Sequence, residues 1–323
     1  MFHRFIAAHL LLITSIANAD ANNANFIQQR ALDPIKLQTG LPEAASRPLT
    51  PSELQVSIVH NNVFMGGRTD SERLILDGES SQVNLRYRQQ INSCVQFNVS
   101  GAWLSNASGW FDNPVNDWHQ LFGLPDAQRG EWPANQLDYS YQKGDRTQAL
   151  EGENSGLGDV QLQVQHNLGC ATNAPILRAG IKVPIVDADQ FLGNGSVDIF
   201  VDAQSPWKRV NPTSRWQWAA SLGLLKPGSS DSLFEQESIV GFGVAGVNVL
   251  LNPQWQLLGQ LDWHTPMFKS DLRELSDIAV QLSLGLRYES RALGTWEMSF
   301  SEDAVIDTAP DIVVRLALTR PIF

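Results

Sequence analysis

The sequence has little basic charge, few cysteines and no long hydrophobic run. Among its 323 residues, 23 are Lys or Arg and 34 are Asp or Glu, which gives a formal net charge of −11. Because no basic stripe is present, a nucleic-acid partner has no electrostatic support. No segment reaches the roughly 18 apolar residues that a transmembrane helix requires. We also find no glycine-rich phosphate loop and no Cys/His metal spacing, so the sequence predicts no cofactor and no metal.

The N-terminus has the features of a secretory signal peptide. Arg4 precedes a mostly apolar stretch over residues 5–16, and Ala17-Asn18-Ala19 fits the small-x-small pattern of a cleavage site. We therefore expect residues 1–19 to be a signal peptide that is cleaved on export. Residues 20–52 carry several Asn and Pro residues, and we predict a periplasmic lead-in segment, with insertion into the barrel as the alternative.

What the sequence has in abundance is a two-residue alternation of apolar and polar side chains. Successive side chains of a strand point to opposite faces, so this alternation predicts strands with one apolar and one polar face. About twelve such segments follow one another from residue 53 onward. In the clearest segment, residues 277–288, one parity holds Ile278, Val280, Leu282, Leu284, Leu286 and Tyr288.

The connections between these segments alternate between short and long. An even number of strands with short turns at one end and longer loops at the other is typical of an outer-membrane barrel. We therefore predict an all-β fold, a single antiparallel transmembrane β-barrel of about twelve strands over residues 53–323, with one long extracellular loop over residues 104–156. A soluble periplasmic β-barrel or two β-sandwiches would also alternate. The signal peptide, the loop asymmetry and the tryptophans near strand ends favour the membrane.

In a transmembrane barrel the polar parity of each strand faces the lumen. The predicted lumen would hold charges of both signs in near balance, which favours cross-linked polar filling over a wide water-filled pore. The predicted lumen charges are Arg86, Arg88, Asp159, Arg178, Lys182, Asp198, Asp202, Arg287, Glu297 and Arg315.

The long loop is predicted to contain a short helix. Asp112 or Asn113 suits its N-cap, Pro114 suits its first position, and Gly123 suits its end. Apolar side chains give this helix an apolar face. We therefore expect the loop to dock on the barrel rim or to fold inward over the mouth, where this face can be buried. Either a gate that contacts ligand or a self-packed cap would account for it.

The ligand or gate candidates lie in this loop and near the end of a late strand. They are Trp118, His119, Leu121, Phe122, Asp262 and His264. The pairs Asp117–His119 and Asp262–His264 also have the residue types of acid/base partners, although a satisfied rim histidine is the commoner explanation. No serine is marked as a nucleophile, so the sequence identifies no catalytic residue.

The two cysteines, Cys94 and Cys170, are predicted to lie in turns at the periplasmic end. Export to an oxidising compartment allows a disulfide between them. The geometry permits this bond without requiring it, and two buried free thiols are the alternative.

Several segments carry a resemblance to a known family. They are residues 117–125 (DWHQLFGLP), 155–159 (SGLGD), 179–184 (AGIKVP), 264–266 (HTP), 301–303 (SED) and 307–311 (DTAPD). With these segments, residues 41–323 resemble the uncharacterised exported proteins of Gram-negative bacteria grouped as domain-of-unknown-function family 3187. The resemblance implies an outer-membrane-type barrel, and it implies no activity.

Three functions follow from these patterns. The first is an outer-membrane barrel that handles a small or lipidic solute through its lumen or long loop. The second is a structural or surface-exposed barrel without a transport role, and the third is an outer-membrane enzyme that modifies lipid. The partners expected of such a barrel are outer-membrane lipid, lipopolysaccharide and the barrel-assembly machinery.

Overall fold

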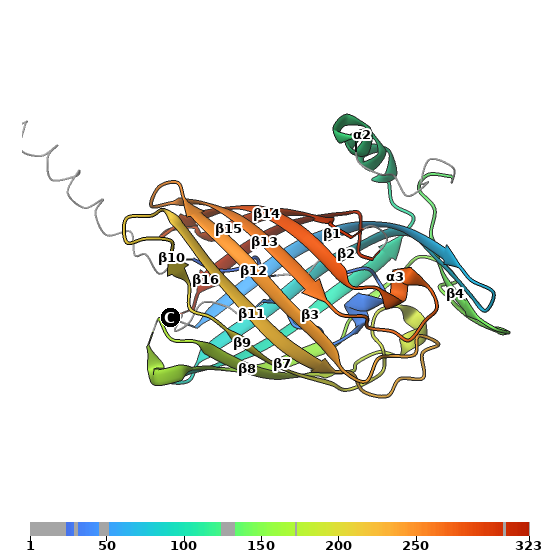
Figure 1. Ribbon diagram of the computed structural model, residues 1–323, viewed down its shortest axis with the longest axis horizontal. Coiled ribbons are helices and arrows are strands. Elements are labelled where there is room, and N and C mark those ends of the chain that lie inside the picture. Colours follow the sequence, from blue (N-terminus) through green and yellow to red (C-terminus); the bar gives the residue numbers. More distant parts are fainter. Residues whose placement is uncertain are drawn as a thin grey trace, which may run out of the picture.

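A computed structural model describes residues 24–28, 32–44, 52–123, 133–171, 173–305 and 308–322. Its main feature is a closed antiparallel barrel of twelve strands (Figure 1). The wall strands are β1 (Glu53–Arg68), β2 (Glu72–Gln90), β3 (Val95–Ala107), β7 (Val160–Asn167), β8 (Ile176–Val183), β9 (Asp198–Gln204), β11 (Trp216–Lys226), β12 (Val240–Leu250), β13 (Trp255–His264), β14 (Ala279–Ser290), β15 (Gly294–Asp303) and β16 (Ile312–Pro321). The ring closes where β1 pairs with β16, so the predicted fold class is confirmed.

The two ends of the barrel differ. The C-terminal end of the chain lies at one end, and the longer connections gather at the other end (Figure 1). Because outer-membrane barrels have short periplasmic turns and longer extracellular loops, the end with the C-terminus is the periplasmic end. The predicted signal peptide, residues 1–19, lies outside the described residues.

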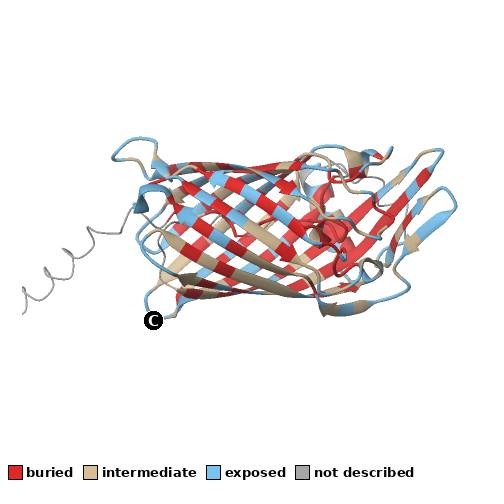
Figure 2. Ribbon diagram, turned by 90° about the horizontal axis from the view of Figure 1, so that it is seen from below, coloured by how far each residue is buried: buried red, intermediate tan, exposed pale blue. Residues whose placement is uncertain are grey.

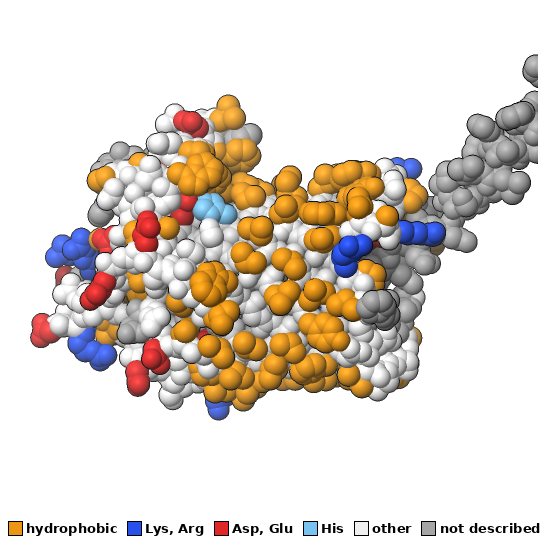
Figure 3. Space-filling view, turned by 180° about the vertical axis from the view of Figure 1, so that it is seen from behind, with side chains coloured by type: hydrophobic (Ala, Val, Ile, Leu, Met, Phe, Trp, Pro, Cys, Tyr) orange, Lys and Arg blue, Asp and Glu red, His pale blue; other side chains and the backbone are white. Residues whose placement is uncertain are grey.

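The outer wall carries the apolar parity of the strands. Buried and exposed residues alternate along the strands (Figure 2), and hydrophobic side chains form a broad band across the face of the barrel that Figure 3 shows. Ile58, Leu85, Leu222 and Met298 are each more than half exposed on this face. This pattern matches the lipid-facing band of a transmembrane barrel. Within the described residues, no helix is long and apolar enough to cross a membrane.

Short helices, strands and turns lie at both ends of the barrel wall. At the extracellular end, β4 (Asp138–Lys143) extends the sheet from β2, β5 (Arg146–Ala149) pairs with β4, and β6 (Asn154–Leu157) pairs with β3. The other short elements are β10 (Lys208–Arg209), α2 (Asp112–Phe122), α3 (Arg273–Ser276) and the 3-10 turns η2 (Lys36–Gln38), η4 (Leu168–Cys170) and η5 (Ala188–Gln190).

The long segment over residues 104–156 is therefore more ordered than the sequence predicts. It contains the helix α2, as expected, but also the hairpin β4–β5 and the start of β6. The hairpin forms because β1 and β2 run beyond the barrel, and the overhanging edge of β2 offers unpaired backbone groups. Tyr139 and Tyr141, which alternate with Ser140 and Gln142, are the sequence signal for this strand.

The ends of α2 agree only in part with the prediction. The helix starts at Asp112, after Phe111, whose side chain makes no capping hydrogen bond, so the proposed capping by Asp112 or Asn113 is wrong. Pro114 lies within the first turn rather than at the first position. Gly123 has a φ of 66° and ends the helix in the left-handed conformation that glycine tolerates best, as predicted.

The predicted disulfide between Cys94 and Cys170 is present. Its Cα atoms lie 4.3 Å apart, and it joins the β2–β3 turn to η4 at the end of β7. Both turns are at the periplasmic end, because β3 and β7 are neighbouring antiparallel strands. The two cysteines are separated by 76 positions in the sequence. Loss of the bond would therefore increase the conformational entropy of the unfolded chain and lower the stability of the fold.

Candidate functional site

A separate stretch of chain occupies the lumen of the barrel. We call residues 24–28 and 32–44 the luminal segment; its apolar members Phe26, Ile27, Leu32, Ile35 and Leu41 are all at most 7% exposed. The sequence predicted a periplasmic lead-in for residues 20–52, with insertion into the barrel as the alternative. The periplasmic placement is wrong for these residues, because their apolar side chains are buried inside the barrel and their backbone groups form hydrogen bonds with the wall.

The luminal segment forms two limbs that lie beside each other. Phe26 on the first limb and Ala44 on the second pack in one apolar cluster with Ala219 and Val244 of the wall. The side-chain amide of Gln28 also donates to the carbonyl oxygen of Ala44 at 3.1 Å. The apex is the 3-10 turn η2, which lies toward the extracellular end of the lumen (Figure 1). The segment thus rises from the periplasmic end and returns to begin β1.

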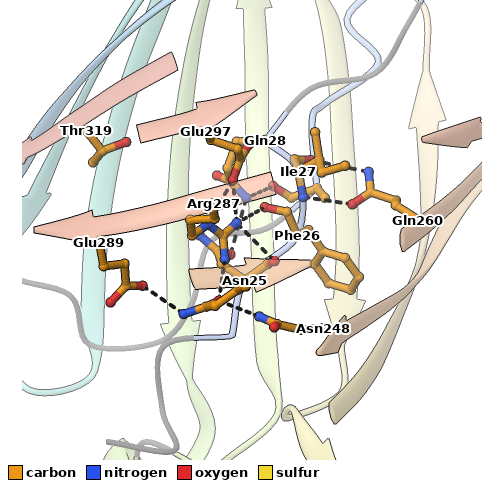
Figure 4. Close-up of polar contacts among 12 residues, drawn as sticks. Asn25, Phe26, Ile27, Gln28, Asn248, Gln260, Arg287, Glu289, Glu297 and Thr319 are labelled. Atoms are coloured by element: carbon orange, nitrogen blue, oxygen red, sulfur yellow. Dashed lines mark hydrogen bonds and ion pairs between the residues drawn. The ribbon is translucent and has the colours of Figure 1, made fainter. Parts of the chain in front are cut away.

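A cluster around Arg287 holds the first limb near the periplasmic end. Arg287 donates to Glu297 through Nε at 2.9 Å, and its Nη2 reaches the carbonyl oxygens of Asn25 and Phe26 at 3.2 and 3.3 Å (Figure 4). Arg315 Nη1 lies 2.5 Å from the other oxygen of Glu297. A single carboxylate therefore pairs with two buried guanidinium groups, one of which also binds the luminal segment.

A second set of contacts holds the returning limb halfway up the lumen. Arg86 forms an ion pair with Glu43 and donates to Gln28 Oε1 at 3.1 Å. Arg178 Nη2 donates to the carbonyl oxygen of Glu43 at 2.6 Å while its Nε faces Asp202 at 3.2 Å. Glu43 is therefore bound through its side chain and its backbone by two arginines of the wall.

A third set of contacts binds the segment near η2. Lys182 Nζ lies 2.6 Å from Asp159 and 3.5 Å from Asp198, and it also donates to Asn194. The backbone N–H of Gly40 donates to Asp198 Oδ2 at 2.7 Å. A β-carbon at Gly40 would lie 2.6 Å from that of Asp198, so only glycine allows the segment to approach the wall this closely.

The ten predicted lumen charges all lie on the inward face. Their side chains are at most 8% exposed, and every one belongs to an ion pair. Arg88 pairs with Glu53 of β1, while most of the others pair between wall strands. The partners that the sequence analysis missed are Glu43 and Glu53, and Glu43 belongs to the segment that was expected in the periplasm.

The extracellular half of the lumen is mostly apolar, although it also holds the buried ion pair between Lys36 and Asp33 of the luminal segment, 2.9 Å apart. Leu32, Ile35 and Leu41 of the luminal segment join one large cluster of buried side chains from the wall and the extracellular loops. The aromatic members of this cluster are Tyr139, Tyr141, Phe191, Phe200, Phe234, Phe242 and Phe268. Aromatic and aliphatic side chains thus predominate toward the extracellular end, whereas the arginine ion pairs lie toward the periplasmic end.

A cavity of about 110 Å³ lies between the luminal segment and the wall. Its lining includes Leu37 and Glu43 of the segment, Arg86 and Gln82 of β2, and Lys182 of β8. The cavity is thus lined by both apolar and charged groups.

Loops at the extracellular end close over the apolar half. Ser71 at the start of β2 donates to Asp271 at 3.3 Å, and the N–H of Asp271 donates to Glu72 Oε2 at 3.0 Å. Further out, Lys269 donates to Glu235 at 3.0 Å. This hydrogen bond lowers the pKa of Glu235 and raises the pKa of Lys269, so the pair stays charged over the physiological range.

The helix α2 lies against the outer wall, not over the mouth of the barrel (Figure 1). The ring of Trp118 lies 5.3 Å from that of Phe300 on β15, and Val115 on the same helix is fully buried. Leu121 is 76% exposed, so the expected docking over the mouth through this side chain is wrong. His119 is buried, and the side chain of Phe122 is outside the described residues. The apolar side of α2 contacts the lipid-facing wall instead.

The other two candidates, Asp262 and His264, lie on the inward face of β13. Both are buried, and Asp262 accepts a hydrogen bond of 2.7 Å from Gln260. His264 Nδ1 lies 2.8 Å from the carbonyl oxygen of Thr265. These contacts make them part of the lumen filling near Leu32 and Lys36, with which they line a small cavity. Across the described part of the chain, no three His, Cys, Asp or Glu side chains converge on a metal site.

Comparisons with known proteins agree with this architecture. The model of a family described as "Protein of unknown function (DUF3187)" matches residues 10–322. No curated protein matches the sequence significantly. Among solved structures, the COG4313 outer membrane channel from Pseudomonas putida F1 is similar, with a TM-score of 0.54 and 12% identity over 88% of this chain and 97% of that one. This likeness shows a shared fold.

Two further structures resemble the chain more distantly. The toluene transporter TbuX of Ralstonia pickettii has a TM-score of 0.44 and 10% identity, and the match covers 91% of this chain and 99% of that one. The NanC porin also has a TM-score of 0.44, with 9% identity over 84% of this chain and all of the porin.

Proposed function

The chain belongs to the family of proteins of unknown function DUF3187, and we propose that it is an outer-membrane channel that the luminal segment closes as a movable plug. The signal peptide supports export with cleavage after Ala19, and the apolar band supports insertion in the outer membrane. The solute class that fits this channel is small and apolar or amphipathic.

The observation that carries this proposal is what fills the lumen. Small barrels are filled by their own side chains, and the largest barrels leave an aqueous channel. Here the wall side chains do not fill the interior alone, because two limbs of a separate segment fit between them. A segment held by hydrogen bonds and ion pairs can leave the lumen, which inward-pointing wall side chains cannot do.

Most charges of the wall remain paired without the segment. Arg287 and Arg315 share Glu297, and Arg178 faces Asp202, all within the wall. Lys182 likewise keeps Asp159. Departure of the segment would therefore expose few unpaired charges, and water entering the lumen would hydrate the remainder. The wall is thus compatible with both a filled and an emptied lumen.

The apolar half of the lumen indicates the class of solute. Ligand sites for small apolar molecules are lined by aromatic and aliphatic side chains with a few polar groups. The extracellular half combines Phe191, Phe234 and Phe268 with Leu and Met side chains, and the cavity beside Leu37 adds polar groups. The name of the Pseudomonas putida protein, an outer membrane channel, is in keeping with this role. The alternative, a structural barrel, requires no such change in lining.

Uptake of an apolar probe in cells tests this proposal. We expect Gram-negative cells that produce the protein to take up the apolar dye N-phenylnaphthylamine faster than cells without it, with no gain for glucose 6-phosphate. Leu37→Gln should reduce the gain because it adds a polar amide to the luminal cavity. The matched variant Leu121→Gln lies outside the barrel and should retain the gain. Equal dye uptake with and without the folded protein would support the structural barrel instead.

A further inference from the structure

Ser81, His60 and Glu79 form a chain of close polar contacts on the outer face of the barrel. Ser81 Oγ is 2.9 Å from His60 Nδ1, and His60 Nε2 is 2.9 Å from Glu79 Oε2. The β1–β2 register places His60 directly opposite Ser81, so the contact is fixed by strand pairing rather than by a flexible loop. A hydroxyl, an imidazole and a carboxylate in this order form the arrangement that activates a serine nucleophile.

The position of these residues in the wall is unusual. Ile58 precedes His60 on the outward parity of β1, and Val83 follows Ser81 on that of β2; their exposed fractions are 56% and 49%. Trp103 on β3 is also half exposed on this face. On β1 and β2, His60 and Ser81 are thus the first polar residues beyond the exposed apolar residues toward the extracellular end. That level is the boundary between acyl chains and headgroups, where the ester bonds of membrane lipids lie.

The segment before α2 covers the carboxylate and leaves the other two groups more open. The backbone N–H groups of Trp110 and Phe111 donate to Glu79 Oε1, the first at 2.6 Å. The ring centroid of Phe111 lies 5.6 Å from that of His60 in an edge-on contact. The side chain of Glu79 is 3% exposed, that of His60 is 26% exposed, and Ser81 is half-buried. The carboxylate is therefore fixed, while the imidazole and the hydroxyl remain accessible.

Anchoring of α2 alone does not explain this arrangement. An anchor needs only Glu79, because its Oε1 accepts both backbone hydrogen bonds. His60 and Ser81 add an imidazole and a hydroxyl directly beside the exposed apolar residues Ile58 and Val83, and polar groups that face lipid are costly. A use for the imidazole and the hydroxyl would account for this cost.

We propose that Ser81, His60 and Glu79 form an esterase site that hydrolyses a fatty acyl ester of a lipid in the outer leaflet. Ser81 Oγ attacks the ester carbonyl carbon while His60 Nδ1 takes the hydroxyl proton. The bond from that carbon to the alcohol oxygen then breaks, and His60 returns the proton to this oxygen. The products of this step are the lipid alcohol and an acyl ester on Ser81.

Water completes the reaction. It attacks the acyl carbonyl carbon and gives a proton to His60, the bond to Ser81 Oγ breaks, and this proton returns to Oγ as the fatty acid leaves. Glu79 acts as a positioning residue, because its carboxylate accepts the Nε2 proton of His60 and so leaves Nδ1 free to act as the base. The balance is one ester and one water converted to one acid and one alcohol.

Fatty acid release from two lipid sources tests the site. The full-length protein would be folded into vesicles of phosphatidylethanolamine and phosphatidylglycerol, or into vesicles that contain lipopolysaccharide. We expect release from at least one source, and the two arms tell a glycerophospholipid ester from an ester of the lipopolysaccharide acyl chains. Ser81→Ala and His60→Asn should each lower the rate by on the order of 10³-fold or more.

Two further variants separate catalysis from folding. Ser283→Ala removes a hydroxyl buried in the lumen, 2.6 Å from that of Ser301, and should leave the rate unchanged. Glu79→Gln retains an acceptor for Trp110 and Phe111 but should shift the pH profile of the reaction, which a purely structural role would not do. A fluorophosphonate probe should label Ser81, as located by mass spectrometry. Absence of both fatty acid release and a Ser81 adduct in the folded protein would overturn the proposal.

Discussion

A variant that lacks residues 24–44 should assemble in the membrane and conduct ions through a stable open channel in planar bilayers. The full-length protein should remain mostly closed under the same conditions. The physical reason is that the luminal segment lies between the wall strands, where Phe26, Ile35 and Leu41 occupy space that water would otherwise fill. A barrel of twelve strands is intermediate between those that side chains fill and those that hold an aqueous channel.

The variant should also remain folded. Of the wall charges that bind the segment, Arg287 keeps Glu297 and Arg178 keeps Asp202. Arg86 loses Glu43, but water can then reach it. Deletion of residues 113–123 is the matched control, because α2 lies on the outer wall, and it should leave the conductance of the full-length protein unchanged. A heat-modifiable band for the variant lacking 24–44, with no conductance, would contradict this expectation.

Glu297→Gln should strongly destabilise the barrel. Its carboxylate pairs with both Arg287 and Arg315, and all three side chains are at most 8% exposed. Removing the charge leaves two buried guanidinium groups without their shared partner, which costs about 3–5 kcal/mol for a broken buried pair. Urea titration of the protein folded in vesicles, monitored by tryptophan fluorescence, would measure this loss as a lower midpoint.

The control for this substitution is Glu235→Gln at the extracellular rim. Glu235 pairs with Lys269, but both side chains are about half exposed, so solvent screens the interaction and the midpoint should barely change. An unchanged midpoint for Glu297→Gln would show that the periplasmic half of the lumen does not depend on this cluster.

The wall could be predicted from the sequence because strand alternation is a local signal. The parity that places Arg178, Arg287 and Arg315 inside also places Leu316 and Met298 outside, and each strand reports its own orientation. The disulfide followed from strand order, since both cysteines lie in turns at the same end. Strand orientation and the positions of the turns can therefore be predicted without knowing which distant segments contact each other.

The luminal segment could not be identified in the same way. Phe26, Ile27, Leu32 and Ile35 have neither helical nor strand periodicity, so nothing local reveals that they are buried. Their partners are distant in sequence; Ile27, for example, donates its N–H to Gln260 of β13 at 2.9 Å. Only the closed barrel brings these groups together.

The outer-face site was missed for a different reason. His60 and Ser81 interrupt the apolar parity of β1 and β2, and this interruption is visible in the sequence. Their contact, however, depends on the register of the β1–β2 hairpin, in which Arg68 pairs with Arg73. Once the position of that turn is known, the register shows that His60 and Ser81 lie opposite each other on β1 and β2. The extended overhang of this hairpin made the turn hard to locate from alternation alone.

The most direct test of the movable plug is a substitution that prevents the luminal segment from docking. Because a β-carbon at Gly40 would lie 2.6 Å from that of Asp198, Gly40→Val should keep the segment from its place against the wall. Gly152→Val is the matched control, because a β-carbon at Gly152 would meet nothing within 4 Å. We predict that folded Gly40→Val conducts ions in planar bilayers more than the wild-type protein does, and that Gly152→Val behaves as the wild type. Equal conductance of folded Gly40→Val and the wild-type protein would contradict the movable plug.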